Sequence, residues 1–172
     1  EELIADNILL QCSDIGKEGK KLLNQQRTRS ARKCVDKYGW ISSGVLIITP
    51  LPVIDMIAAA AVNAQMVIEI GNIYGVDLTK EGARNLAVSV GKILATMGLV
   101  KGGVSLISST LSLTLPTLVI SKVIQGISVS WLTRIAGASF ITYFQQDQDW
   151  GDGGIQEVVE YHYNLNKREE YF

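Results

Sequence analysis

The sequence predicts an all-α fold, a bundle of helical hairpins with Gly- and Ala-rich hydrophobic helices. Two stretches carry this prediction. The first, Pro52 to Tyr74, is largely apolar, begins at a proline and is followed by Gly75. The second runs from Thr79 to Lys101 and has its polar residues along one stripe. No second strand-like stretch is available to build a sheet, and 172 residues suffice for one domain with a buried core.

The N-terminal residues 1–26 are predicted to form an amphipathic helix. Ile8, Cys12 and Ile15 are among the apolar residues that recur at spacings of three and four on one face. A basic run follows over residues 25–37. We therefore predict a first unit, residues 1–37, that is an amphipathic and basic connector helix.

The basic run has the composition of a membrane-proximal patch. Lys and Arg dominate residues 17–37, and Trp40 follows at the start of an uncharged stretch. At the cytoplasmic interface of a membrane, cations are followed by aromatics and then by apolar residues. A solvated helix face is the alternative, and a nucleic-acid patch is disfavoured because no aromatics interleave with the cations. The candidate contacts with lipid headgroups are Lys20, Lys21, Arg27, Arg29, Arg32 and Lys33.

The second predicted unit, residues 38–146, is a hydrophobic helical hairpin domain. Residues 38–54 carry no charge over 17 positions but contain two prolines. This pattern favours a buried core helix, or one leg of a re-entrant or interfacial hairpin, over a span. In the next helix Asp55 and Glu69 would be costly in lipid and need partners, for which Lys92 and Arg134 are candidates.

Small residues recur every three or four positions along the helix that Thr79 is expected to cap. This spacing lets two helices approach closely, in membranes and in soluble bundles alike. The predicted helix-packing residues are Ala87, Gly91, Ala95, Gly98 and Gly102.

The second half of the chain contains a longer uncharged stretch, residues 102–121. Its 20 positions match the length needed to cross a bilayer, although Pro116 makes a span marginal. We expect a helix from Leu115 or Pro116 to Phe144. A third unit, residues 147–172, comprises an exposed acidic loop and a polar C-terminal helix. The acids of that loop lack the order of a calcium-binding loop.

No constellation of residues predicts catalysis, and we expect that this segment is not an enzyme. The single histidine, His162, is expected to be exposed on a helix and excludes a multi-histidine metal site. Gly91-Lys92 lacks the Ser or Thr that follows the lysine of a phosphate loop, so the segment itself should bind no nucleotide. Cys12 and Cys34 have no metal-ligand spacing. We therefore expect no catalytic residues, no cofactor and no metal here.

The region from Pro50 to Thr79 carries a family resemblance. It rests on Pro52 and Asp55 at the start of the helix, Ala58 to Ala61, Gln65 with Met66, and Ile73-Tyr74-Gly75 to Leu78-Thr79 at its end. With these features the chain resembles the YcjF-like bacterial domain of unknown function, in a cyanobacterial form, over about residues 39–144. The resemblance implies a membrane-associated helical domain that follows an Era-type GTPase domain, with GTP bound upstream and not in this segment.

The patterns and the resemblance together predict a non-catalytic, membrane-associated module that anchors or oligomerises a GTPase-family protein. The expected partners are membrane lipids and either a second copy of the chain or a membrane protein complex, without nucleic acid. The expected place is the cytoplasmic side of a bacterial inner or thylakoid membrane. Two alternatives stay open: a soluble all-α interaction or oligomerisation bundle, and an accessory subunit of a larger membrane complex that contacts pigments or lipids.

Overall fold

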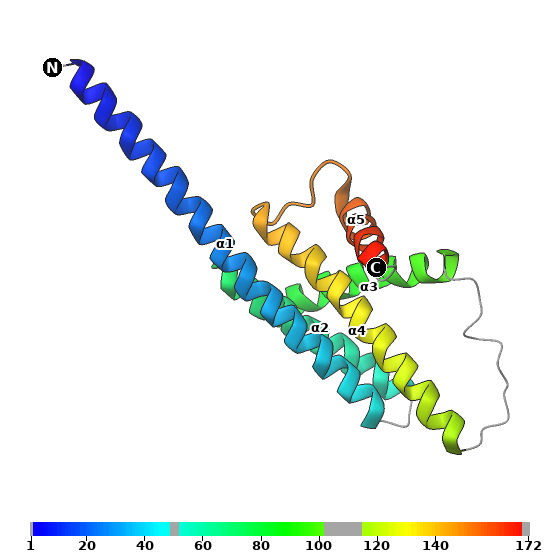
Figure 1. The fold of residues 1–172 in the computed structure, drawn as a ribbon. Helices are drawn as coiled ribbons and strands as arrows, with labels where there is room; N and C mark the ends of the chain where they lie inside the picture. Colours follow the sequence, from blue (N-terminus) through cyan, green and yellow to red (C-terminus); the bar gives the residue numbers. More distant parts are fainter. Residues whose placement is uncertain (1, 49–51, 102–114, 170–172) are drawn as a thin grey trace.

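The protein is all-helical in a computed structural model (Figure 1). The structure describes residues 2–48, 52–101 and 115–169, with side chains described within residues 10–44, 61–97 and 129–166. The described residues form five helices and no strand, which confirms the all-α prediction. The helices are α1 (Glu2–Ile48), α2 (Pro52–Tyr74), α3 (Lys80–Lys101), α4 (Leu115–Gln145) and α5 (Gly154–Glu169). α1 and α2 form an antiparallel hairpin, and α4 lies beside α1 (Figure 1).

α1 is one continuous helix of 47 residues, about 70 Å long at 1.5 Å per residue. Its N-terminal part projects away from the other helices (Figure 1), and every side chain of residues 10–26, here termed the arm, is exposed. Burial recurs at Ala31, Cys34, Val35 and Tyr38, the spacing of one helix face, where α1 packs on α4 and α2. The boundary predicted at residue 37 therefore falls inside a helix.

α2 begins and ends where the sequence predicts. Gly75 adopts a φ of 82°, and its N–H donates to the carbonyl oxygen of Asn72 at 3.1 Å. The Val76 N–H donates to the carbonyl oxygen of Gly71 at 2.9 Å. This pair of hydrogen bonds is a Schellman motif, which a left-handed glycine completes. A Cβ at Gly71 would lie 3.0 Å from the Val76 carbonyl oxygen and 3.2 Å from Leu78, so the turn also needs a small residue there.

Thr79 caps α3, as predicted. Its Oγ1 accepts a hydrogen bond from the Gly82 N–H at 3.1 Å, and its carbonyl oxygen accepts one from the Ala83 N–H at 3.0 Å. Most of the uncharged stretch that follows, residues 102–114, lies outside the described residues. α4 then begins at Leu115, as predicted, and ends at Gln145, one residue beyond the predicted end.

All five helices contribute to the core, and α4 contacts each of the other four. Among the side chains that the structure describes, Phe140 is the largest that is fully buried, and Met66, Ile70 and Ile135 are also fully buried. α1 and α4 approach closely at Gly137, where an added Cβ would overlap the side chain of Val35. This approach is possible because Gly137 has no side chain. The contact fixes the C-terminal half of α1 to the body and leaves the arm as an extension.

The described residues bear on the transmembrane helix expected from the uncharged stretches. Across the described residues, no helix combines the length and the apolar composition needed to traverse a bilayer. The expectation of a transmembrane helix is therefore not supported.

The structure corrects the partners expected for Glu69. Glu69 accepts two hydrogen bonds, both of 2.6 Å, from the Nζ of Lys37 in α1. Arg134 instead approaches Asp36, with 3.5 Å between its Nε and the Oδ1. Both pairs join α1 to a neighbouring helix, because the basic run packs along α2 and α4 on its flanks. The side chain of Asp55 lies outside the described residues.

Candidate anion-binding surface

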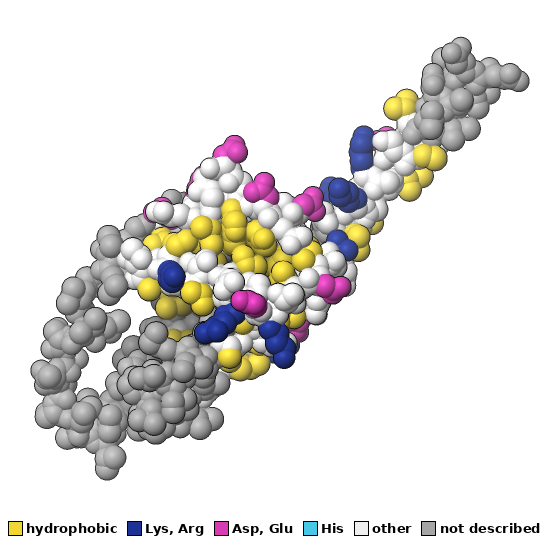
Figure 2. Space-filling model, turned by 180° about the vertical axis from the view of Figure 1, so that it is seen from behind, with side chains coloured by type: hydrophobic (Ala, Val, Ile, Leu, Met, Phe, Trp, Pro, Cys, Tyr) yellow, Lys and Arg dark blue, Asp and Glu magenta, His cyan; other side chains and the backbone are white. Residues whose placement is uncertain are grey.

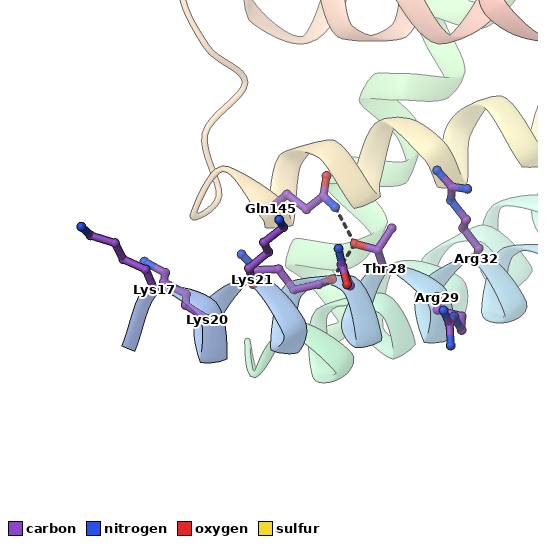
Figure 3. Close-up of a pocket in the computed structure, with 9 residues that line it drawn as sticks. Lys17, Lys20, Lys21, Thr28, Arg29, Arg32 and Gln145 are labelled. Atoms are coloured by element: carbon purple, nitrogen blue, oxygen red, sulfur yellow. Dashed lines mark hydrogen bonds between the residues drawn. The ribbon is translucent and has the colours of Figure 1, made fainter. Parts of the chain in front are cut away.

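A basic hollow lies where the arm of α1 leaves the body of the protein (Figure 3). It is open to solvent and has a volume of about 820 Å³. It is lined by eight residues of α1 and one residue at the end of α4, namely Lys17, Lys20, Lys21, Asn24, Gln25, Thr28, Arg29, Arg32 and Gln145. Five of these nine side chains are cations and none is an acid. This set of residues is termed the basic hollow.

Thr28 fixes the wall of the basic hollow by joining three helices. Its hydroxyl donates to the Asn24 carbonyl oxygen at 2.7 Å and accepts from the Nε2 of Gln145 at 2.6 Å. Because its single proton is used in this way, the Tyr74 hydroxyl at 3.3 Å must be the donor to Thr28. The Thr28 hydroxyl thus holds the ends of α2 and α4 against α1.

The positive charge of the basic hollow is largely uncompensated. Lys17 approaches Asp14 at 3.4 Å, but both side chains are about three-quarters exposed (75% and 76%), and a pair of this kind contributes little. The other four cations form no ion pair with a described residue: Lys20, Lys21, Arg29 and Arg32. Like charges three or four positions apart on a helix repel by roughly 0.2–0.5 kcal/mol per pair. An anion in the hollow would relieve this repulsion.

The side of α1 that faces away from the body carries exposed residues of mixed chemistry. Ile15, Leu22, Lys33 and Trp40 share this side, because they are spaced by two, three and two helical turns. Ile15 is 72%, Leu22 62% and Trp40 74% exposed. These four residues, together with Arg29, are termed the outer face of α1. Figure 2 shows apolar and basic side chains side by side along the projecting arm.

Arg29 lies at the edge between the basic hollow and the outer face. In Figure 3 the Arg32 side chain extends toward α4, whereas that of Arg29 points away from it. The same run of sequence therefore presents cations on two surfaces with different shapes. One surface is concave and basic, and the other is convex, basic and apolar.

A polar cluster joins α1 to α2 beside the basic run. Partial burial works to raise the pKa of Glu69, but hydrogen bonds from Lys37 and Tyr38 outweigh it and hold that pKa below its usual value. Burial, with the negative charge of Glu69, raises the pKa of the Cys34 thiol to about 12. Burial and the hydrogen bond to the same carboxylate also raise the pKa of Tyr38. Cys34 therefore remains a protonated, unreactive thiol, and the cluster is structural.

His162 is not exposed as the sequence predicts. It is partly buried between α5 and α4, and its Nε2 lies 2.8 Å from the Oγ1 of Thr142. Burial lowers the pKa of His162, and the positive charge of Arg32 lowers it further. The imidazole is therefore neutral near pH 7. Arg32, a cation of the basic hollow, thus acts electrostatically on a residue of α5.

The predicted helix-packing residues fall into different surroundings. Ala87 is buried, whereas Gly91 and Ala95 are exposed, and a Cβ at Gly91 would meet nothing within 4 Å. All three line a second hollow of about 220 Å³ between α2, α3 and α4. The surroundings of Gly98 and all of Gly102 lie outside the described residues.

The six predicted headgroup contacts separate into three groups. The basic hollow receives four of them: Lys20, Lys21, Arg29 and Arg32. Lys33 lies on the outer face, and Arg27 is partly buried beside the turn at Gly75. The prediction missed Gln145, since it is 117 positions from Thr28 and no local signal joins them. The outer face could have been predicted from the spacing of seven residues between Ile15 and Leu22 and between Lys33 and Trp40.

The described residues offer hydrogen-bond donors and positive charge but no metal-ligand cluster. No group of three or more His, Cys, Asp or Glu side chains among them could hold a metal ion. Arginine, lysine and amide groups bind anions through charge-assisted hydrogen bonds, without covalent chemistry. The arrangement is therefore suited to noncovalent recognition of anionic groups.

Comparison with known proteins gives the family but no close relative. No curated protein matches the chain, and no solved structure matches it. The family model described as "Domain of unknown function (DUF697)" matches residues 10–168, which include the arm and all five helices in whole or in part. The chain therefore belongs to the DUF697 family of domains of unknown function.

Proposed function

We propose that this domain is a non-catalytic module that docks on an anionic membrane surface through the outer face of α1. The observation that carries the proposal is Trp40, which is 74% exposed on the same side of the helix as Lys33 and Leu22. In this proposal α1 lies along the surface and does not cross it.

The chemistry of the outer face suits a membrane interface. Tryptophan favours the headgroup region, where its apolar ring is buried and its N–H stays hydrated. Each cation near an anionic surface contributes roughly 1 kcal/mol, so Arg29 and Lys33 together would strengthen adsorption by about 30-fold. Asp36, the nearest acid in sequence to Trp40, is partly neutralised by Arg134 at 3.5 Å. Helices that lie in the interface combine apolar and basic side chains in this way.

The family resemblance supports a more specific version of the proposal. In that version the module positions an Era-type GTPase domain, which lies upstream, at the cytoplasmic side of a bacterial inner or thylakoid membrane. The long α1 would then connect the two domains. This version requires a phosphate-loop motif, G-x-x-x-x-G-K followed by Ser or Thr, in the sequence upstream of Glu1. A full-length sequence without that motif would rule out the GTPase, but not the docking.

Liposome flotation tests the docking. We expect the chain to float with phosphatidylcholine liposomes that contain phosphatidylglycerol and to stay in the dense fraction with phosphatidylcholine alone. Trp40→Ala should weaken binding by about tenfold or more, because the apolar transfer of a large side chain contributes about 1.5–3 kcal/mol. Tyr161→Ala is the matched control, since Tyr161 is 60% exposed but lies on α5. Equal flotation of the wild type and Trp40→Ala would contradict the proposal.

A second candidate function is a protein-interaction or oligomerisation bundle. The observation that favours it is the hollow beside Gly91 and Ala95, in which the buried Oδ1 of Asn63 has no hydrogen-bond partner. A helix of a second copy with small residues could fill such a hollow. Analytical ultracentrifugation of the wild type and Gly91→Leu tests it. A dimer that dissociates in the variant is expected, and a monomer at all concentrations would exclude self-association.

A further inference from the structure

We propose that the basic hollow is a binding site for a phosphoryl group, carried by a lipid headgroup or by a soluble phosphate compound. The site is distinct from the outer face in shape and in residues, with Arg29 alone at the edge of both. The inference therefore stands or falls separately from membrane docking through Trp40.

The first argument is charge. Four cations in the hollow are without an ion-pair partner among the described residues, although the chain contains 17 acidic residues. The two kinds of cation complement each other for phosphate: the Arg32 guanidinium can donate two parallel hydrogen bonds, and the Lys20 and Lys21 ammonium groups supply compact charge. An oxyanion with several acceptor oxygens uses both.

The second argument is shape. The cations lie on one stretch of α1 from Lys17 to Arg32, which spans about 22 Å of helix axis. Gln145 closes the hollow from α4, and its hydrogen bond of 2.6 Å to Thr28 holds that wall in place. The volume of about 820 Å³ exceeds what a single phosphate needs. The hollow therefore has room for a ligand larger than phosphate, in which a second anionic group would suit the cations that remain.

The third argument excludes the nearest internal occupant. The loop after α4 carries acids, but neither Asp147 nor Asp149 lines the hollow. The Oδ1 of Asp149 accepts a hydrogen bond from the Gly151 N–H at 3.1 Å, so this carboxylate is engaged in its own turn. The acidic loop thus borders the hollow in sequence without neutralising it, which leaves the site open to an external anion.

Calorimetric titration of the chain with inorganic pyrophosphate, at constant ionic strength, tests the site. We expect saturable binding that weakens by about tenfold or more in Lys20→Ala/Lys21→Ala and in Arg32→Ala, since each removes charge-assisted hydrogen bonds. Arg32→Lys should retain part of the affinity, because it keeps the charge and loses the planar fork. Lys80→Ala is the control, an exposed lysine on α3 that does not line the hollow. The absence of saturable binding, or equal weakening by Lys80→Ala, would overturn the proposal.

Liposomes identify the source of the phosphate. Phosphatidic acid presents a phosphomonoester and phosphatidylglycerol a phosphodiester, and the two are compared at equal surface charge. A preference for phosphatidic acid that Lys20→Ala/Lys21→Ala removes would support a lipid headgroup. Pyrophosphate binding without that preference would support a soluble phosphate compound. Trp40→Ala should reduce binding to both liposomes and leave the pyrophosphate titration unchanged, so failure of membrane docking is distinguished from failure of this site.

Discussion

The two halves of α1 differ in what holds them in place. The anchored half, residues 31–42, buries Ala31, Val35 and Tyr38 against α4 and α2. The arm, residues 10–26, is exposed along its whole length and contains two glycines that each lower helix propensity by about 1 kcal/mol relative to alanine. Packing thus stabilises one half, while the other presents charge and apolar surface to whatever binds it. The difference indicates that one face of the anchored half serves the fold, whereas its opposite face, with Lys33 and Trp40, and the whole arm stay exposed.

Truncating one large side chain in each half of α1 should give the largest difference in the free energy of unfolding. Tyr38→Ala is expected to lower the free energy of unfolding by about 3–5 kcal/mol, because Tyr38 is only 7% exposed and its loss leaves a cavity. Leu22→Ala in the arm should change it by less than about 0.5 kcal/mol. Urea denaturation followed by circular dichroism measures both. A cost for Leu22→Ala that approaches that of Tyr38→Ala would mean that the arm packs on the body.

Two glycine substitutions should have opposite signs. Gly137→Ala is expected to destabilise the protein by about 1–3 kcal/mol, because its Cβ would overlap Val35 in the contact between α4 and α1. Gly19→Ala should increase helicity and cost nothing, since a Cβ there would meet nothing within 4 Å. Ellipticity at 222 nm and the urea midpoint report the two effects. A loss of stability in both variants would contradict the assignment of the arm as unpacked.

The free energy of unfolding should show a pH dependence that comes from His162, which is partly buried between α5 and α4. The pKa of His162 is lowered in the folded state, so between that pKa and about 6.5 the unfolded chain binds more protons. The free energy of unfolding should therefore fall as the pH drops below about 6.5 and level off below the folded pKa. His162→Gln should remove this dependence. The assignment is unambiguous because the chain has one histidine. An unchanged profile between pH 5.5 and 7.5 would rule out the burial of this imidazole.

Glu69 should change the free energy of unfolding over a lower pH range than His162 does. Its pKa is lowered in the folded state, so its contribution is present above about 4.5 and is lost as the pH falls through the folded value. Glu69→Gln should therefore flatten the acid limb of the stability profile and leave the limb near pH 6 in place. Loss of both limbs in this variant would mean that the two groups are coupled.

The two thiols of the folded protein should differ in their reactivity toward a labelling reagent. Cys12 is exposed in the arm, whereas Cys34 is buried in the anchored half and has a pKa raised to about 12 by burial and Glu69. Ellman's reagent at pH 8 is expected to label one thiol per native chain. Cys12→Ser should abolish this labelling and Cys34→Ser should preserve it. Rapid labelling of two thiols would show that the anchored half opens readily.

Local signals in the sequence predicted the helix ends well. The start of α2 at Pro52, its end before Gly75 and the Thr79 cap of α3 each depend on residues within one turn. The continuity of α1 through residue 37 was not predicted, because a change in composition from basic to apolar does not end a helix. The partner of Glu69 and the position of His162 depend on packing between distant segments, which single-residue patterns do not contain.

The candidate site was predictable in charge but not in shape. Composition predicted that the basic run is a candidate surface for lipid headgroups, with a solvated helix face as the alternative. Its division into a concave and a convex surface depends on how α1 is rotated against α4, which is set by the buried positions Ala31, Val35 and Tyr38. Gln145 completes the hollow from the far end of another helix, so only the fold could reveal it.

The fluorescence of Trp40 offers a direct view of whether the outer face meets a membrane. On addition of liposomes that contain phosphatidylglycerol, the emission maximum of the chain should shift to shorter wavelength, because the exposed indole leaves water. The shift should be absent with phosphatidylcholine alone, absent in Trp40→Phe, and reduced in Arg29→Ala/Lys33→Ala. If the emission is unchanged with anionic liposomes, or if Trp40→Phe shows the same shift from Trp131 and Trp150, the outer face of α1 is not a membrane-docking surface.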